Sequence, residues 1–184
     1  MTIQPLKTGA TYDDLCLVSD RYIAEMFDGE LYASPRPPLP HARAATKLVA
    51  TLYDRFDLEG PGGWLLLVKP ELHFRNDVLV PDIAGWRRER LPAVPDLAYL
   101  TLAPDWVCEV LSPSTEAIDR GPKLRIYARE GVVHAWLIDP LRQSLEALAF
   151  ESRRCEALEA HHGNEAIRAR PFEAIELELR ALWI

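Results

Sequence analysis

The chain has 184 residues, of which 48% are apolar and 27% charged, values that are ordinary for a single folded domain over residues 1–184. Its formal net charge of −7 excludes a broadly basic surface that would wrap nucleic acid non-specifically, although it does not exclude a local basic cleft. The three scattered cysteines form no C-x-x-C pair, which excludes a disulfide framework and a cysteine-rich zinc site.

The N-terminal residues MTIQPLKTGATYDD lack the apolar core of a secretion signal. No apolar run in the chain approaches the about 20 residues that a membrane-spanning helix needs. Together with the unpaired cysteines, these features predict a cytoplasmic protein that does not associate with membranes.

The first predicted elements are a short helix, a hairpin and a longer helix. Thr11 is a typical first cap of a helix, and Asp14 stands at the position of its capping-box partner. Strand-like runs flank Asp28-Gly29, a dipeptide that accepts the positive φ of a tight hairpin turn. The prolines of SPRPPLP end the second strand, and apolar residues at helical spacing then predict a helix from about His41 to Phe56.

The middle of the chain is rich in strands. Residues 60–74 read as a run of strands that the RND turn leads back into VLVPDIAGW, and residues 87–104 read as an irregular connection with several prolines. Residues 105–112 then predict a strand, residues 115–130 a helix and residues 132–139 a second strand. This order is typical of a β-α-β crossover with parallel strands.

Two details complete the predicted fold. We expect the crossover helix to start near Asp119, so that Pro122 falls in its first turn, and to end at Gly131. The C-terminal tail predicts two or three further strands, over residues 144–150, 153–160 and 174–184. The result is an α/β fold with α+β character, in which helices flank a mixed, mainly antiparallel sheet that contains one β-α-β crossover.

Two acids interrupt strands that otherwise look buried. Asp82 lies in VPDIAGW and Glu109 in WVCEVLS, 27 residues later (109 − 82), while Lys123 lies in the helix that follows. An unpaired buried carboxylate costs several kcal/mol, and two adjacent ones raise each other's pKa. A divalent cation resolves this conflict, because Mg²⁺ and Mn²⁺ favour carboxylate oxygens, so we expect Asp82 and Glu109 to bind one of these ions.

Each of these residues also has an ordinary explanation. Asp82 alone reads as a turn residue, Glu109 alone as a solvent-facing strand residue and Lys123 alone as a solvated helix residue. Asp119 reads either as a helix N-cap or as a carboxylate that orients Lys123. His41 opens a helix and is an accessory candidate. Only the joint occurrence of the two acids and the lysine points to chemistry.

Four segments carry a family resemblance: VPDIAGW, DWVCEVLSPST, DRGPKLRIYAREGV and AWLIDP. They resemble the PD-(D/E)XK nuclease superfamily, and most closely its Uma-type branch of restriction endonucleases. The resemblance implies that Pro81-Asp82 is the PD element and Glu109 the D/E element. The usual lysine position is Leu111 here, and the branch instead places the lysine on the next helix, where Lys123 stands. Glu30 in DGEL matches an acid common in the branch, or is simply a strand residue beside a turn.

The resemblance implies a restriction-endonuclease-like fold and metal-dependent hydrolysis of phosphodiester bonds, most simply in DNA held in a local cleft. Asp82, Glu109 and Lys123 would be catalytic, with Mg²⁺ or Mn²⁺ as cofactor, and a homodimer would follow by analogy with enzymes that cut both strands. Two alternatives stay open: an inactive nuclease-like fold that serves as a binding or assembly module, and an enzyme that hydrolyses a small phosphate ester. An open, positive cleft would favour DNA and a closed pocket a small substrate.

Overall fold

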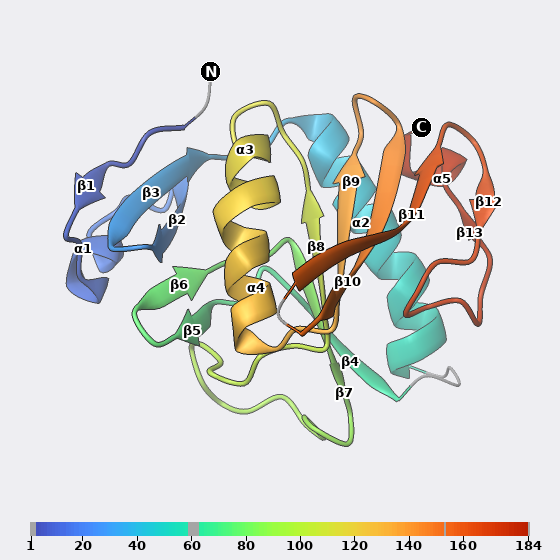
Figure 1. Cartoon of the computed structure of the whole chain (residues 1–184), viewed down its shortest axis with the longest axis horizontal. Coiled ribbons are helices and arrows are strands. Elements are labelled where there is room, and N and C mark those ends of the chain that lie inside the picture. Colours follow the sequence, from blue (N-terminus) through green and yellow to red (C-terminus); the bar gives the residue numbers. More distant parts are fainter. Residues whose placement is uncertain (1–2, 59–62, 153, 184) are drawn as a thin grey trace.

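The computed structural model describes residues 3–58, 63–152 and 154–183. Residues 60–62, 153 and 184, which the strand predictions included, lie outside the described residues. Two large sheets organise the fold, and Figure 1 shows the smaller one beside the crossover helix, on the side away from the larger sheet. The fold is therefore a mixed α+β arrangement of sheets and flanking helices, as the sequence predicted.

The larger sheet has six strands in the order β11-β10-β9-β8-β7-β4. Neighbours are antiparallel except for β8 and β9, which run parallel with Glu109 opposite Leu137. The predicted mixed sheet with one β-α-β crossover is thus confirmed. Its strands are β4 (Trp64–Val68), β7 (Ile83–Arg87), β8 (Trp106–Val110), β9 (His134–Asp139), β10 (Ser144–Glu151) and β11 (Arg154–His162).

The smaller sheet has five antiparallel strands in the order β1-β3-β2-β6-β5. Asp28 and Gly29 form the predicted hairpin turn with φ values of 54° and 76°, and the strands on either side pair in register. Its strands are β1 (Lys7–Thr8), β2 (Tyr22–Phe27), β3 (Glu30–Pro35), β5 (Leu72–Phe74) and β6 (Asp77–Leu79).

Pro81-Asp82 forms the joint between the two sheets. The pattern of VLVPDIAGW predicts one strand run, but β6 ends at Leu79 in the smaller sheet and β7 begins at Ile83 in the larger one. Pro81 has no N–H to continue a strand ladder, so the chain changes sheets there. Asp82 therefore lies between two strands rather than inside one.

The helices are short apart from α2, and none of those in the described residues is long and apolar enough to cross a membrane. Thr11 and Asp14 form the predicted capping box at the start of α1. The predicted strands over residues 144–150 and 153–160 are confirmed, in their described residues, as β10 and β11. The predicted strand over residues 174–184 was wrong: its described part contains one strand of a small two-stranded sheet and a helical turn, with Leu179 and Leu182 buried. These elements are α1 (Tyr12–Cys16), α2 (Leu39–Leu52) with a π-helical turn (Tyr53–Leu58), β12 (Ala166–Ile167), β13 (Leu177–Glu178) and α5 (Arg180–Trp183).

The crossover helix falls within the predicted residues 115–130 but begins before Asp119. It consists of α3 (Glu116–Ile118), a π-helical turn (Asp119–Lys123) and α4 (Leu124–Glu130), and Gly131 ends it in the left-handed conformation with φ 86°. Pro122 lies inside the helix rather than in its first turn. A proline clashes with the carbonyl four residues earlier, and the wider π-helical turn avoids that clash. The start near Asp119 was therefore wrong, whereas the end at Gly131 is confirmed.

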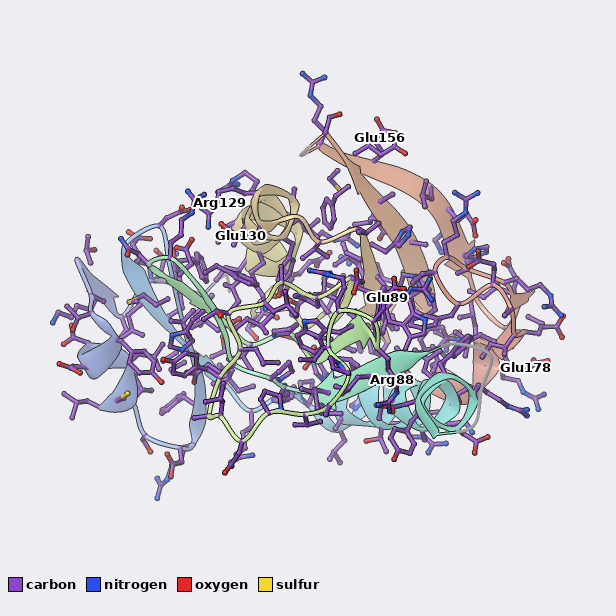
Figure 2. The ribbon with its side chains drawn as sticks, turned by 90° about the horizontal axis from the view of Figure 1, so that it is seen from below. Arg88, Glu89, Arg129, Glu130, Glu156 and Glu178 are labelled. Carbon is purple, nitrogen blue, oxygen red and sulfur yellow. The ribbon has the colours of Figure 1, made fainter. Side chains whose placement is uncertain are left out.

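The two faces of the larger sheet are covered by different elements. Trp106, Cys108 and Val110 pack with α2 and the C-terminal tail, while Val107 and Leu111 pack with α4. Figure 2 shows the two coverings on opposite sides of the sheet, with Arg129 and Glu130 marking the end of α4. Since strand residues alternate between faces, Glu109 points toward the crossover helix. This alternation places its carboxylate under Lys123.

Candidate active site

One cavity of about 40 Å³ lies where the two sheets meet. The smaller sheet contributes Glu25 from β2, the joint contributes Asp82, and the larger sheet contributes Glu109 from β8. Helix α2 contributes His41, the crossover helix contributes Asp119 and Lys123, and Lys69 follows β4. The ionisable residues of the lining are Glu25, His41, Lys69, Asp82, Glu109, Asp119 and Lys123.

Asp82 is held by groups from three elements. Its Oδ2 accepts a hydrogen bond from the backbone N–H of Val110 at 2.8 Å and lies 3.0 Å from Nε2 of His41 on α2. Its Oδ1 lies 2.7 Å from Nζ of Lys69. Burial alone would raise the pKa of this carboxyl, but the His41 and Lys69 contacts outweigh burial and lower it to about 2. Asp82 is therefore ionised and fixed in position.

Glu109 is buried more deeply and shares its cationic partner. Its Oε1 lies 2.9 Å from Nζ of Lys123 and accepts a hydrogen bond from the Tyr127 hydroxyl at 2.5 Å. Burial raises the pKa of Glu109 to about 8; Lys123 opposes this shift, and the carboxylates of Asp119, Asp82 and Glu25 add to it. At neutral pH Glu109 therefore holds a proton when no other cation is near.

Lys123 lies at the centre of three carboxylates. Besides Glu109, its Nζ is 3.0 Å from Oε1 of Glu25 and 3.4 Å from Oδ1 of Asp119. Burial lowers the pKa of the ammonium, but Glu109 and Glu25 outweigh burial and raise it well above its ordinary value. Burial also raises the pKa of Asp119, to about 6. Three acids thus compete for one ammonium, so the ammonium stays charged while Glu109 keeps its proton.

The structure brings together five of the six residues that the sequence singled out, namely Asp82, Glu109, Lys123, Asp119 and His41. Asp119 is not an N-cap, because it lies within the helix, one turn before Lys123. Glu30 does not line the cavity: it starts β3 beside the hairpin turn, where its carboxylate accepts a hydrogen bond from Tyr32 at 2.5 Å.

Three residues that contact the candidate catalytic side chains were not predicted from the sequence: Glu25, Lys69 and Tyr127. Tyr127 stands four residues after Lys123, a spacing that places both on one helical face, so this signal was present. Glu25 reaches the cavity only because β2 pairs with β6, and Lys69 only because β4 ends opposite Asp82. Such long-range pairings leave no local pattern.

The donor chemistry of the cavity fits a hard divalent cation. Four carboxylates face two ammonium groups, which leaves two excess negative charges when all the acids are ionised and His41 is neutral. Within residues 3–58, 63–152 and 154–183, however, no three His, Cys, Asp or Glu side chains form a ready-made metal cluster. An ion held by Asp82 and Glu109 would therefore need water or substrate oxygens as further ligands, as Mg²⁺ commonly does.

Comparisons with known proteins agree with this geometry. A family model described as Uma2, putative restriction endonuclease, matches residues 10–181. A crystal structure of a putative nuclease belonging to DUF820 from Anabaena variabilis has a TM-score of 0.76, with 20% sequence identity over 95% of this chain and 97% of that chain. At this identity the likeness shows the fold alone. No curated protein matches the chain.

Proposed function

The chain belongs to the Uma2 family of putative restriction endonucleases, and from that premise we propose that it is a metal-dependent nuclease that hydrolyses phosphodiester bonds in DNA. One observation carries the proposal. Lys123 Nζ lies 2.9 Å from the Glu109 carboxylate in the same cavity that Asp82 lines, so two acids and a lysine from distant segments converge. Replacing such buried charges with apolar residues of similar volume is often neutral or stabilising, so their presence together points to a use.

Asp82 and Glu109 would hold Mg²⁺ or Mn²⁺, with Asp82 ionised in advance and Glu109 losing its proton as the ion binds. Such an ion supplies Lewis-acid polarisation of a phosphoryl oxygen and activation of a bound water. His41 and the Val110 N–H fix the orientation of Asp82, and the Tyr127 hydroxyl fixes that of Glu109. The protein therefore contributes two oriented carboxylates to one cavity.

Lys123 is a charged group in this scheme rather than a general base. Its pKa lies well above the ordinary value because Glu109 and Glu25 surround it, so it does not release a proton near neutral pH. A fixed ammonium stabilises negative charge that develops on a phosphate in the transition state. Glu25 and Asp119 hold the ammonium in place from two sides.

The cavity's size favours a polymer over a small ester. Pockets that enclose small ligands usually measure about 300 Å³ or more, whereas the cavity here measures about 40 Å³. It has room for a few water-sized groups and not for a nucleotide. A substrate would therefore present one phosphate of its backbone at the mouth and stay outside otherwise, as DNA does.

A homodimer belongs to the same proposal, because cutting both strands of a duplex calls for two sites related by a twofold axis. Sedimentation of the full chain, alone and with a blunt duplex in Ca²⁺, tests it. We expect a dimer at least in the presence of DNA. A monomer under both conditions would contradict the proposed dimer and would leave the proposed metal site and reaction unaffected.

The test of the proposed activity is cleavage of supercoiled plasmid and of labelled duplex and single-stranded DNA in Mg²⁺, Mn²⁺ or EDTA. We expect cleavage with either ion and none in EDTA. Asp82→Asn, Glu109→Gln and Lys123→Met should each lower the rate at least about a hundredfold. The matched control is Glu30→Gln, an acid outside the cavity, which should stay within about twofold of the wild type.

Calorimetric titration of Mn²⁺ into the same proteins separates the alternatives. Ion binding by the wild type that Asp82→Asn abolishes supports the metal site. If the folded wild type neither binds an ion nor cuts any substrate, the nuclease proposal fails. DNA binding in EDTA, without cleavage, would then favour the binding-module alternative.

A further inference from the structure

Lys69 is the second lysine of the cavity, and its placement is unusual. It directly follows β4, and its φ of 48° lies in the left-handed region that residues other than glycine rarely adopt. Its backbone N–H donates to the carbonyl of Asp82 at 3.1 Å, and its Nζ lies 2.7 Å from Oδ1 of the same residue. Main chain and side chain of Lys69 are thus both engaged with Asp82.

The two carboxylate oxygens of Asp82 have different partners. Oδ2 accepts from the Val110 N–H at 2.8 Å and lies 3.0 Å from Nε2 of His41, two buried groups that belong to the framework of the fold. Oδ1 faces the ammonium of Lys69. A metal ion that uses Asp82 has to approach Oδ1, because Oδ2 already receives two donors. The ion and the ammonium therefore compete for the same oxygen.

Lys69 is also the more easily removed of the two lysines. Its side chain is 37% exposed, whereas that of Lys123 is 3% exposed. Lys123 is surrounded by three carboxylates, while Lys69 pairs with one at the edge of the cavity. A flexible four-carbon stem at an exposed position can turn the ammonium into solvent without disturbing the core.

We propose that the Lys69 ammonium occupies the cation position at Asp82 while the metal is absent, and that a divalent ion binds by displacing it. The inference rests on the proposed metal site. Lys69 then keeps the carboxylate oriented in the metal-free protein and weakens metal binding by direct competition. The affinity for the ion is set by the fraction of molecules in which Oδ1 is free.

The test is the affinity for Mn²⁺, measured by calorimetry on the full chain in EDTA-cleared buffer, for the wild type and Lys69→Met. If Lys69 occupies Oδ1 in most molecules, its removal should tighten Mn²⁺ binding roughly tenfold. Lys69→Arg keeps a competing cation and should bind no more tightly than the wild type. A second neutral variant, Lys69→Asn, suits the positive φ of this position and guards against a folding defect.

The matched control is Lys7→Met, because Lys7 also pairs with an aspartate, its Nζ lying 2.6 Å from Asp14, but lies outside the cavity. It should leave Mn²⁺ affinity within about twofold. Tighter binding in both neutral Lys69 variants supports competition, since general damage to the site would weaken binding instead.

The outcomes separate the two proposals. Unchanged or weaker binding in Lys69→Met and Lys69→Asn, with the wild type binding and Asp82→Asn not binding, overturns the role of Lys69 and leaves the metal site intact. Binding by the neutral variants and not by the wild type supports strong competition. Absence of binding in the folded wild type and both neutral variants overturns the role of Lys69 together with the metal site.

Discussion

The Asp82 half and the Glu109 half of the cavity hold carboxylates in opposite states. Asp82 has a buried N–H, His41 and Lys69 to itself, and its pKa falls to about 2 although it is buried. Glu109 shares Lys123 with two other acids, and burial raises its pKa to about 8. Burial therefore does not decide the state of a carboxylate; the number of cationic and N–H partners per carboxylate does. Positive charge is lacking on the Glu109 side.

The sharpest test of this comparison removes the lysine on each side. Lys123→Met leaves Glu25, Glu109 and Asp119 buried without their ammonium, which should lower the free energy of unfolding by about 3–5 kcal/mol. Lys69→Met should cost about 1 kcal/mol or less, because its pair is partly exposed. Urea unfolding at pH 7 measures both. Equal losses would mean that the halves do not differ in their dependence on a lysine.

A second test compares two acids of the β2–β3 hairpin. Glu25→Ala removes the acceptor of the Val80 N–H, at 2.8 Å, and one partner of Lys123, so the free energy of unfolding should fall by about 1–3 kcal/mol. Glu30→Ala removes only the partner of the Tyr32 hydroxyl, which can turn to water, and should cost less than about 1 kcal/mol. Thermal or urea unfolding measures both losses. A larger loss for Glu30→Ala than for Glu25→Ala would mean that Glu25 does not stabilise the Glu109 half of the cavity.

The pH dependence of stability should differ between the halves. Glu109 has a folded-state pKa of about 8 against an ordinary 4.5, so between these values the native state holds a proton that the unfolded state has lost. Stability present below pH 4.5 is therefore lost as the pH rises toward 8, with a slope of up to about 1.4 kcal/mol per pH unit. Glu109→Gln should remove this slope between pH 6 and 8 in urea unfolding without metal, whereas Asp119, whose pKa burial raises to about 6, still contributes a slope below pH 6.

Asp82 should affect the pH dependence of stability at acidic pH, where its contribution falls as the pH falls. Its folded-state pKa of about 2 lies below the ordinary 3.8, so its contribution is present above pH 3.8 and is lost as the pH falls toward 2. Asp82→Asn should flatten this acid limb. It should keep the loss of stability at neutral pH and move it slightly toward lower pH, because the Asp82 charge adds to the raised pKa of Glu109. Loss of the same limb in both variants would contradict the division into two halves.

The smallest expected effect concerns Tyr127, whose hydroxyl donates to Glu109 at 2.5 Å. Tyr127→Phe should cost about 1 kcal/mol of unfolding free energy at pH 6, where Glu109 is protonated. The cost should be larger at pH 9, because a hydrogen bond to an ionised carboxylate is the stronger one. Urea unfolding at both pH values measures the difference, with Tyr53→Phe as the control, an exposed tyrosine at the start of the π-helical turn after α2.

Local sequence patterns were enough to predict much of this fold. The Asp28-Gly29 turn, the Thr11 cap and the Gly131 stop each depend on a few adjacent residues. The proximity of Glu109 and Lys123 also followed from sequence, because a crossover helix returns over the strand that precedes it. These features need no knowledge of distant parts of the chain.

The features that could not be predicted from the sequence depend on distant pairings. Lys69 meets Asp82 because β4 and β7 pair in one register, and Glu25 meets Lys123 because a second sheet packs beside the first. The chain changes sheets at Pro81, which has no N–H for a strand ladder. It widens into a π-helical turn around Pro122, whose ring would clash with a regular helix. A proline predicts that some adjustment occurs, but not which one.

The placement of the cavity between two sheets has a consequence for protein synthesis. Glu25 and Lys123 are 98 residues apart (123 − 25), and the segments that hold Asp82 and Glu109 lie between them. A nascent chain that has left the ribosome only as far as Glu109 carries Glu25, Asp82 and Glu109 but lacks the Lys123 ammonium that pairs with Glu25 and Glu109. The site is therefore assembled only after the crossover helix has been synthesised, so a half-made chain lacks a complete site.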